Sequence, residues 1–301
     1  MVNEMEFEAS VNKKVRYMAN HIWDGLGNTH IDAFLKNFEK EDKMVGWTML
    51  DMLIYYSSEQ EQSIVSNLIR QLKRDIWIES GMAKQDLPSE QINLEFEKIL
   101  RKMCLVPVDD SNPAASAFGI TPQIEVSKEM PGVTYINVDE IPLMVAMKYK
   151  YFVFYDDLIG TGNQFEKFWR HTEFGSKSNR FKLSELVEKN TDVRFYLLTL
   201  GGCEAGLQRL KKSVPKVKII VSEYFPEHYD VLNEKNEYWE LNPDNKDVVC
   251  EFIKKKEKEL NYYSKYSKNL PVLFQRGRAS NTTLSLYWYG KDGQWEGLHK
   301  R

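Results

Sequence analysis

One stretch near the middle of the chain sets the architecture: Tyr151-Phe152-Val153-Phe154-Tyr155-Asp156-Asp157-Leu158-Ile159-Gly160-Thr161-Gly162-Asn163-Gln164. Its first five residues form an aliphatic and aromatic run of the kind found in strands buried on both faces of a parallel sheet. Two acids follow, then a threonine between two glycines, and then a helical pattern. Because ligands bind beyond the carboxyl ends of strands in open parallel sheets, this order predicts a ligand site at residues 156–164.

The residue types of this stretch suit a phosphosugar. Gly160 and Gly162 allow backbone N–H groups to approach an anion without a Cβ in the way, and the helix start adds further donors and a positive dipole end. Asp156 and Asp157 suit two ribose hydroxyls or a hydrated Mg²⁺. The alternative interpretation is a plain strand-to-helix turn with a cap. A Walker lysine motif and a GxSxG motif are both absent from the sequence, which removes two rival kinds of α/β site.

Strand-like and helical patterns alternate on both sides of this stretch. The strand candidates are residues 103–108, 151–155, 194–200 and 217–221. Helical patterns at 164–169, 183–189 and 205–212 separate the last three strands. This alternation predicts an α/β fold, with an open parallel sheet and flanking helices.

The two ends of the chain do not show this alternation of strands and helices. Ile31, Phe34, Leu35 and Phe38 form one apolar helical stripe. Residues 44–56 are apolar nearly all round and predict a buried helix, whereas 284–289 are a candidate last strand. We therefore expect three parts.

The three expected parts are a helical N-terminal region at 1–102, an α/β core at 103–230, and a mixed C-terminal elaboration at 231–301 that packs on the core.

Composition excludes several functional classes. The chain has 301 residues and a net charge of -3, so it lacks the basic footprint of a nucleic-acid-binding protein. No apolar run approaches the ~18 residues of a membrane span, and the first residues do not form a secretory signal. The three cysteines are far apart and imply no disulfide framework. A reduced, cytoplasmic location is the expectation.

The acid pair and glycine turn resemble the phosphoribosyl diphosphate motif of type I phosphoribosyltransferases. The resemblance implies that Asp156 and Asp157 contact the ribose hydroxyls and serve Mg²⁺, which neutralises the pyrophosphate. It implies that the 5′-phosphate is held by Gly160, Thr161, Gly162, Asn163 and Gln164. Most members of that family end the loop with Thr or Ser, so the side-chain contribution of Asn163-Gln164 differs here.

A narrower resemblance covers more of the chain. Residues 31–38 and 50–57, the glycine turn and the ending Asn281-Thr282-Thr283-Leu284 with Trp288 and Trp295 are similar to the phosphoribosyltransferase-like domain of bacterial anti-phage conflict systems, including some retrons. This resemblance implies an effector role and partner proteins such as a reverse transcriptase or a winged-helix protein.

Two other segments are candidates for phosphate contacts. In phosphoribosyltransferases a loop of small residues after an early strand binds pyrophosphate, and the segment that begins at Ser111 has that place and composition. A surface turn with capping side chains is an equal alternative. Arg276 and Arg278 flank a glycine and form a candidate phosphate clamp, with solvated surface arginines as the alternative.

These observations predict a pentosyltransferase of the phosphoribosyltransferase type that binds phosphoribosyl diphosphate or a nucleotide. Glycosyl transfer needs positioning and electrostatic help more than a protein nucleophile, so the lack of a nucleophile motif agrees with it. One alternative is a phosphosugar or nucleotide sensor that has lost the reaction. Another is an interaction protein that docks onto a partner complex through its two ends.

Overall fold

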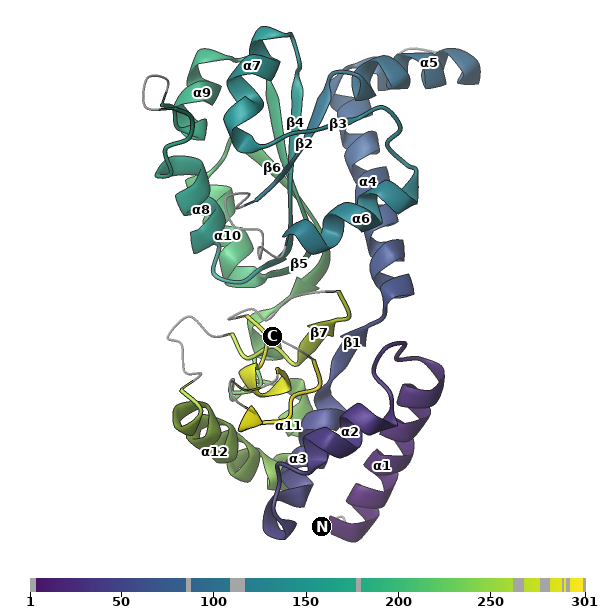
Figure 1. Ribbon diagram of the computed structural model, residues 1–301, viewed down its shortest axis with the longest axis vertical. Helices are drawn as coiled ribbons and strands as arrows, with labels where there is room; N and C mark the ends of the chain where they lie inside the picture. Colours follow the sequence, from purple (N-terminus) through teal and green to yellow (C-terminus); the bar gives the residue numbers. More distant parts are fainter. Residues whose placement is uncertain are drawn as a thin grey trace. The chain divides into compact units, whose positions relative to one another are not determined.

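The computed structural model describes residues 4–84, 88–108, 117–176, 180–261, 268–276, 282–288, 290 and 293–299. Figure 1 shows its elements, which divide into two compact units. The first unit combines Met1–Glu61 with Pro226–Arg301, and the second is Gln62–Phe225. Parallel strands, flanking helices and a helical N-terminal region confirm the expected α/β class.

The second unit is built on a five-stranded sheet with the strand order β3-β2-β4-β5-β6, and all of its pairs are parallel. Its strands are β2 (Met103–Pro107), β3 (Thr134–Tyr135), β4 (Tyr151–Ile159), β5 (Arg194–Cys203) and β6 (Val217–Phe225). Its helices are α4 (Ser58–Glu79), which starts in the first unit, η2 (Met82–Lys84), α5 (Ser89–Leu100), α6 (Ala117–Ser127), η3 (Val138–Glu140), α7 (Ile141–Ala146), α8 (Asn163–Arg170), α9 (Leu183–Lys189) and α10 (Glu204–Ser213).

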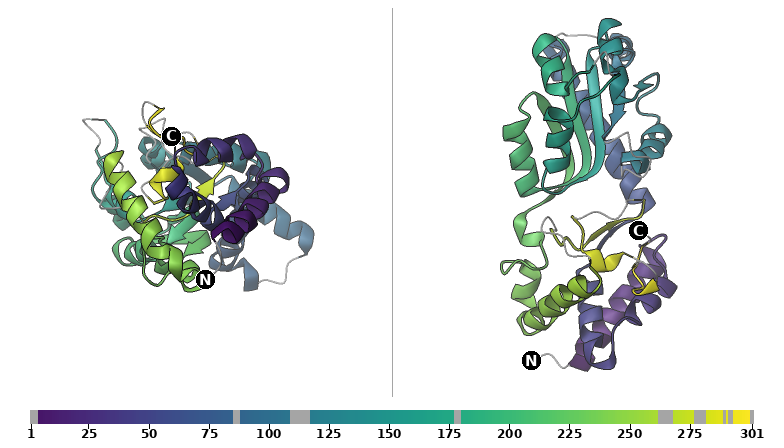
Figure 2. Two further views of the ribbon diagram at one scale, coloured as in Figure 1. Left: turned by 90° about the horizontal axis from the view of Figure 1, so that it is seen from below. Right: turned by 60° about the vertical axis from the view of Figure 1, so that its left-hand side comes forward.

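The central strand β4 is covered on both faces, as Figure 2 shows for the sheet. On one face Phe152 and Phe154 pack into a core with residues of α7, α8, α9 and α10. On the other face Tyr155 meets side chains of α4 and α6. A strand buried on both sides needs apolar residues at successive positions, and the run at 151–155 supplies them. The expected helices at 164–169, 183–189 and 205–212 correspond to α8, α9 and α10.

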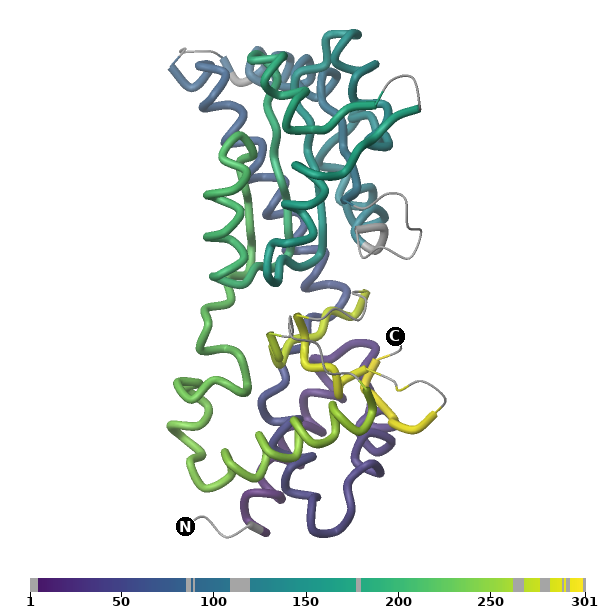
Figure 3. The backbone as a smooth tube through the Cα atoms, turned by 90° about the vertical axis from the view of Figure 1, so that its left-hand side faces the viewer, coloured from purple at the N-terminus to yellow at the C-terminus, as the bar shows by residue number. Residues whose placement is uncertain are grey.

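The first unit brings the two ends of the chain together. Its elements are α1 (Glu4–His21), α2 (Asn28–Leu35), η1 (Lys40–Asp42), α3 (Lys43–Met52), β1 (Ile54–Tyr56), η4 (Glu227–Tyr229), α11 (Glu237–Leu241), α12 (Pro243–Glu259), β7 (Val272–Phe274) and η5 (Ser285–Tyr287). β1 pairs with β7 in parallel. Phe38 stacks on Phe252 and meets Trp295 edge-on, so early and late segments share one core, visible in Figure 3 as adjoining purple and yellow tube.

Three local features differ from the expectations. The C-terminal segment was not expected to share a core with the N-terminal helices, and it does so. The apolar run at 44–56 is not one helix, because α3 ends at Met52, Leu53 is extended and residues 54–56 form β1. Residues 285–287 form a 3-10 turn instead of a last strand.

The first unit also buries an acid, and this predicts a pH effect. Glu257 of α12 is 3% exposed and accepts a hydrogen bond from the Ser285 hydroxyl at 2.5 Å. Burial raises the pKa of the Glu257 carboxyl above its usual value, against the hydrogen bonds from Ser285, and the Asp230 carboxylate adds to the increase. The folded state therefore binds more protons than the unfolded chain above about pH 4.3, the usual glutamate value, and stability falls as pH rises through that window.

We expect Glu257→Gln to remove this loss of stability, because an amide oxygen still accepts from Ser285 and carries no charge. Urea unfolding at pH 4 and pH 8 measures this effect. Relative to the wild type, the free energy of unfolding of the variant should be higher at pH 8 than at pH 4, by about 1.4 kcal/mol for each unit by which the fold raises the pKa of Glu257. Glu251→Gln, an exposed position of the same helix, serves as the control and should stay within about 0.5 kcal/mol. A variant whose stability relative to the wild type is the same at both pH values would contradict the assignment.

Candidate functional site

The acid pair lies inside β4 and not after it. The expected strand ended at Tyr155, but β4 continues to Ile159, and Asp156 pairs with Thr199 of β5. Asp156 and Asp157 are 6% and 5% exposed. The backbone N–H of Asp157 donates to Asp156 Oδ1 at 2.9 Å, so the second acid helps to orient the first.

The glycine turn is a short connection between β4, which ends at Ile159, and α8, which begins at Asn163. Gly162 has φ 75° and ψ -4°, a left-handed conformation that favours glycine, and it precedes the first helical residue, Asn163. The Thr161 hydroxyl accepts from Asn163 N–H at 3.4 Å. The side chains of Thr161 and Asn163 are half-buried and that of Gln164 is exposed. Helix α8 thus starts six residues after Asp157, and its N-terminal N–H groups favour an anion.

Helix α10 packs against the turn through another glycine, Gly206. A Cβ added to Gly206 would lie 2.1 Å from the Gly160 carbonyl oxygen, closer than any real contact. A Cβ on Gly162 would in turn lie 2.9 Å from the Gly206 oxygen. The two helices are joined by an ion pair of 2.6 Å between Glu166 and Arg209. Gly206 is not among the site residues predicted from the sequence, although an isolated glycine inside a helical pattern often has a packing reason.

The topology places this turn where ligands bind in open sheets. From β2 the chain adds β3 on one side, whereas β4, β5 and β6 extend the sheet on the other. The strand order therefore reverses between β2 and β4, and the crevice beyond their carboxyl ends is the expected ligand position. β2 ends at Pro107, which pairs with Tyr155, and Val108 N–H donates to the Tyr155 oxygen at 3.1 Å. The chain leaves β2 directly beside Asp156.

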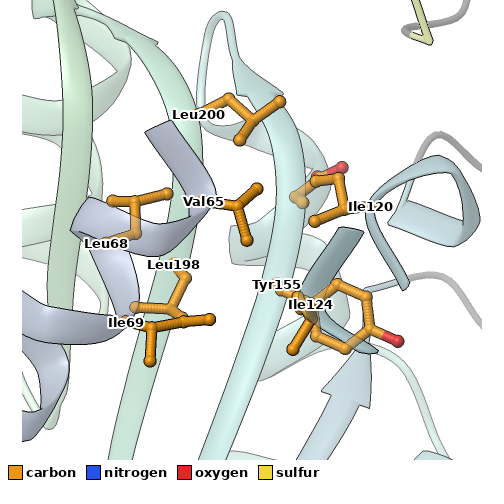
Figure 4. A pocket seen from close by; sticks show the side chains of 9 residues that line it. Val65, Leu68, Ile69, Ile120, Ile124, Tyr155, Leu198 and Leu200 are labelled. Carbon is orange, nitrogen blue, oxygen red and sulfur yellow. The ribbon is translucent and has the colours of Figure 1, made fainter. Parts of the chain in front are cut away.

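A small apolar hollow adjoins Asp156 on the side of α4 and α6 (Figure 4). Its lining consists of Val65, Leu68, Ile69, Ile120, Ile124, Tyr155, Asp156, Leu198 and Leu200. The hydroxyls of Tyr155 and Thr121 share a hydrogen bond of 2.8 Å. Burial raises the pKa of Tyr155, against that hydrogen bond, so a protonated phenol ties α6 to β4.

Two predicted site residues, Ser111 and Arg278, lie outside the described residues. Arg276 is described and belongs to the first unit. Its Nε donates to the Ser58 hydroxyl at 3.0 Å and its backbone N–H donates to Glu61 at 2.9 Å. These contacts hold Arg276 at the start of α4.

The described residues contain no group of three or more histidine, cysteine, aspartate or glutamate side chains arranged to hold a metal ion. Mg²⁺ usually takes one or two carboxylates and completes its shell with water and substrate phosphates. The carboxylate oxygens of Asp156 and Asp157 fit that pattern. They would hold the ion together with a phosphate-bearing ligand.

Comparison with known proteins shows the family. Residues 31–301 match the PRTase-CE family, and the chain belongs to this family, whose members are phosphoribosyltransferase-like. A search of curated proteins finds no match. Among solved structures, the AQ2163 protein from Aquifex aeolicus is similar with a TM-score of 0.30 and 11% identity, over 69% of this chain and 86% of that chain. A likeness at that level carries no argument about fold or function. In the part of the chain that is described, no helix is both long and apolar enough to cross a membrane.

The contact between Gly206 and the turn leads to a test of how the site is held. We expect Gly206→Ala to destabilise the protein by about 1–3 kcal/mol, the usual cost of overpacking, because the added methyl meets a backbone oxygen that cannot move alone. Urea unfolding measures this loss. Gln208→Ala, on the exposed side of the same helix, should change stability by no more than about 0.5 kcal/mol. Equal stabilities of the two variants would show that the turn is free to move away from α10.

Proposed function

We propose that this chain binds phosphoribosyl diphosphate or a nucleotide, with Mg²⁺, in its second unit and acts on it as a pentosyltransferase. One observation carries the proposal: a central parallel strand leads through Asp156 and Asp157 into a left-handed glycine and a helix start, at the reversal of strand order. Membership of the PRTase-CE family supports it. The two acids would hold the ribose hydroxyls, and residues 160–164 would hold the 5′-phosphate.

The proposed reaction depends more on the position of the substrate and of charged groups than on a reactive side chain. Transfer at the anomeric carbon of ribose passes through an oxocarbenium-like state, as in glycoside hydrolysis. The carboxylates of Asp156 and Asp157 place negative charge near that centre, and the N–H groups at the start of α8 favour the negative phosphate. Mg²⁺, when bound, supplies charge neutralisation for the pyrophosphate. Run in reverse, with pyrophosphate bonding to the anomeric carbon as the base leaves, such a site cleaves nucleotides to free base and phosphoribosyl diphosphate.

The proposed biological role is that of a cytoplasmic effector in bacterial anti-phage defence. It rests on the resemblance of the N-terminal stripe, the glycine turn and the C-terminal tryptophans to conflict-system domains. A reverse transcriptase or a winged-helix protein encoded nearby is the kind of partner that this role implies. Nucleotide cleavage would deplete a pool that an infecting phage needs.

A second candidate is a sensor that binds the same ligand without turnover. Asn163-Gln164, in place of the usual hydroxyl residues of the loop, favours it. Product formation from phosphoribosyl diphosphate or nucleotides, followed by chromatography, separates the two candidates. The enzyme forms product that depends on Asp157, whereas the sensor binds the ligand and returns it unchanged.

Ligand-dependent thermal stability tests the shared part of both candidates. We expect phosphoribosyl diphosphate with Mg²⁺, at about 100 times its Kd, to add about 2.7 kcal/mol to the folded state. For a protein of this size that corresponds to a rise in Tm of at least ~2 °C. In Asp157→Asn the rise should disappear, because the amide replaces one acceptor of the ribose hydroxyls by a donor.

Asp230→Asn is the matched control, since it changes a half-buried acid of the first unit and should keep the full ligand-induced rise. Failure of the wild type to respond to phosphoribosyl diphosphate and to a panel of nucleotides would reject a ligand site at the turn. A rise that persists undiminished in Asp157→Asn would place the ligand elsewhere.

A further inference from the structure

The sheet is interrupted at one level, next to the acid pair. Between β4 and β5 the pairing runs without a break up to Asp156 with Thr199, passes over Asp157 and Leu200, and resumes at Leu158 with Gly201. Between β5 and β6 it likewise passes over Leu200 and resumes at Gly201. All these residues belong to the described part of the sheet. A gap that two ladders share at the same residue is a local change in the backbone of β5, and not fraying of an edge.

The interruption changes which way the side chains of β4 face. In a regular strand successive side chains point to opposite faces, so Asp156 would share the face of Phe154 and Ile159 the face of Tyr155. Instead Asp156 lines the same hollow as Tyr155, and Ile159 packs in the core on the side of Phe154. The strand has shifted by one position in its alternation, which moves every later side chain to the other face.

The hydroxyl of Thr199 occupies this interruption. Thr199 is completely buried, and its Oγ1 lies 2.7 Å from the Gly201 carbonyl oxygen and 3.2 Å from the Asp157 carbonyl oxygen. The proton of this hydroxyl therefore bridges carbonyl groups of two neighbouring strands at the level where the backbone ladder is missing. A buried carbonyl oxygen that loses its donor pays the full cost of desolvation.

We propose that Thr199 is a positioning residue for the acid pair: its hydroxyl holds the interrupted backbone in the one arrangement that presents Asp156 and Asp157 to a phosphosugar. This inference rests on the proposed function. Thr199 belongs to β5, whereas the acid pair belongs to β4. Thr199 itself is completely buried in β5. Its effect reaches the ligand through the carbonyl of Asp157.

The test compares the affinity of four proteins for phosphoribosyl diphosphate with Mg²⁺, measured by titration calorimetry at a temperature where each is folded by circular dichroism. Thr199→Val has the same shape without the hydroxyl and should bind about 10–100-fold more weakly, the range found when the hydrogen-bond partners of metal-ligating residues are removed. Thr199→Ser keeps the donor and should bind within about threefold of the wild type. The control is Thr48→Val in the first unit.

Thr48 is equally buried, and its hydroxyl donates to the Met44 oxygen at 2.9 Å. Thr48→Val therefore loses a comparable hydrogen bond, and we expect lower stability with unchanged affinity. A merely structural role of Thr199 would give that same pattern for Thr199→Val. Should Thr199→Val fail to fold, Thr199→Cys, with a weak donor of similar size, should bind more weakly than the wild type.

The outcomes are distinct for the two proposals. A wild type that does not bind overturns the proposed function and this inference with it. A wild type that binds, together with unchanged affinity in Thr199→Val or in its cysteine substitute, overturns the inference alone. Weaker binding that serine restores supports the positioning role.

Discussion

The architecture of the second unit depends on the parallel pairing of β4 with β2 on one side and β5 on the other. This pairing provides hydrogen-bond partners for the backbone N–H and C=O groups of β4. Because the side chains of β4 are apolar on both faces, helices must cover the sheet on both sides. It also fixes the direction in which β4 points. The chain must leave the sheet at the reversal of strand order, and the acids and the glycine turn are carried there with it.

A close approach of two backbones gives the turn its rigidity. Gly160 and Gly162 meet Gly206 of α10 at distances that leave no room for a side chain, and the ion pair of Glu166 with Arg209 joins the helices on the outside. A phosphate site made of backbone N–H groups has value only if those groups are already in place when the anion arrives. The glycines allow the packing that holds the loop, and in the proposed site they would also leave the backbone N–H groups open to a phosphate.

The acid pair of the proposed site is almost completely buried. In the expected arrangement the two carboxylates stood at the end of the strand, whereas here they lie within it and the strand changes its alternation around them. At the level of the second acid, Leu200 of β5 has no ladder partner on either neighbouring strand. The sheet thereby gives up ladder pairing at one level, and the Thr199 hydroxyl replaces part of it.

Local patterns in the sequence were enough for β4, the glycine turn, α8 and the α/β class, because strand burial, left-handed glycines and helical periodicity act within a few neighbouring residues. The same patterns failed at 54–56 and 285–287, where β1 exists only because β7 pairs with it and where Leu286 and Tyr287 are buried by distant helices. Thr199 carries no local signal of its contact with Asp157, and the glycine at 206 does not by itself indicate that its partner is Gly160. Their roles arise from strands and helices that meet across the fold, and the free energy of such contacts depends on partners far away in the chain.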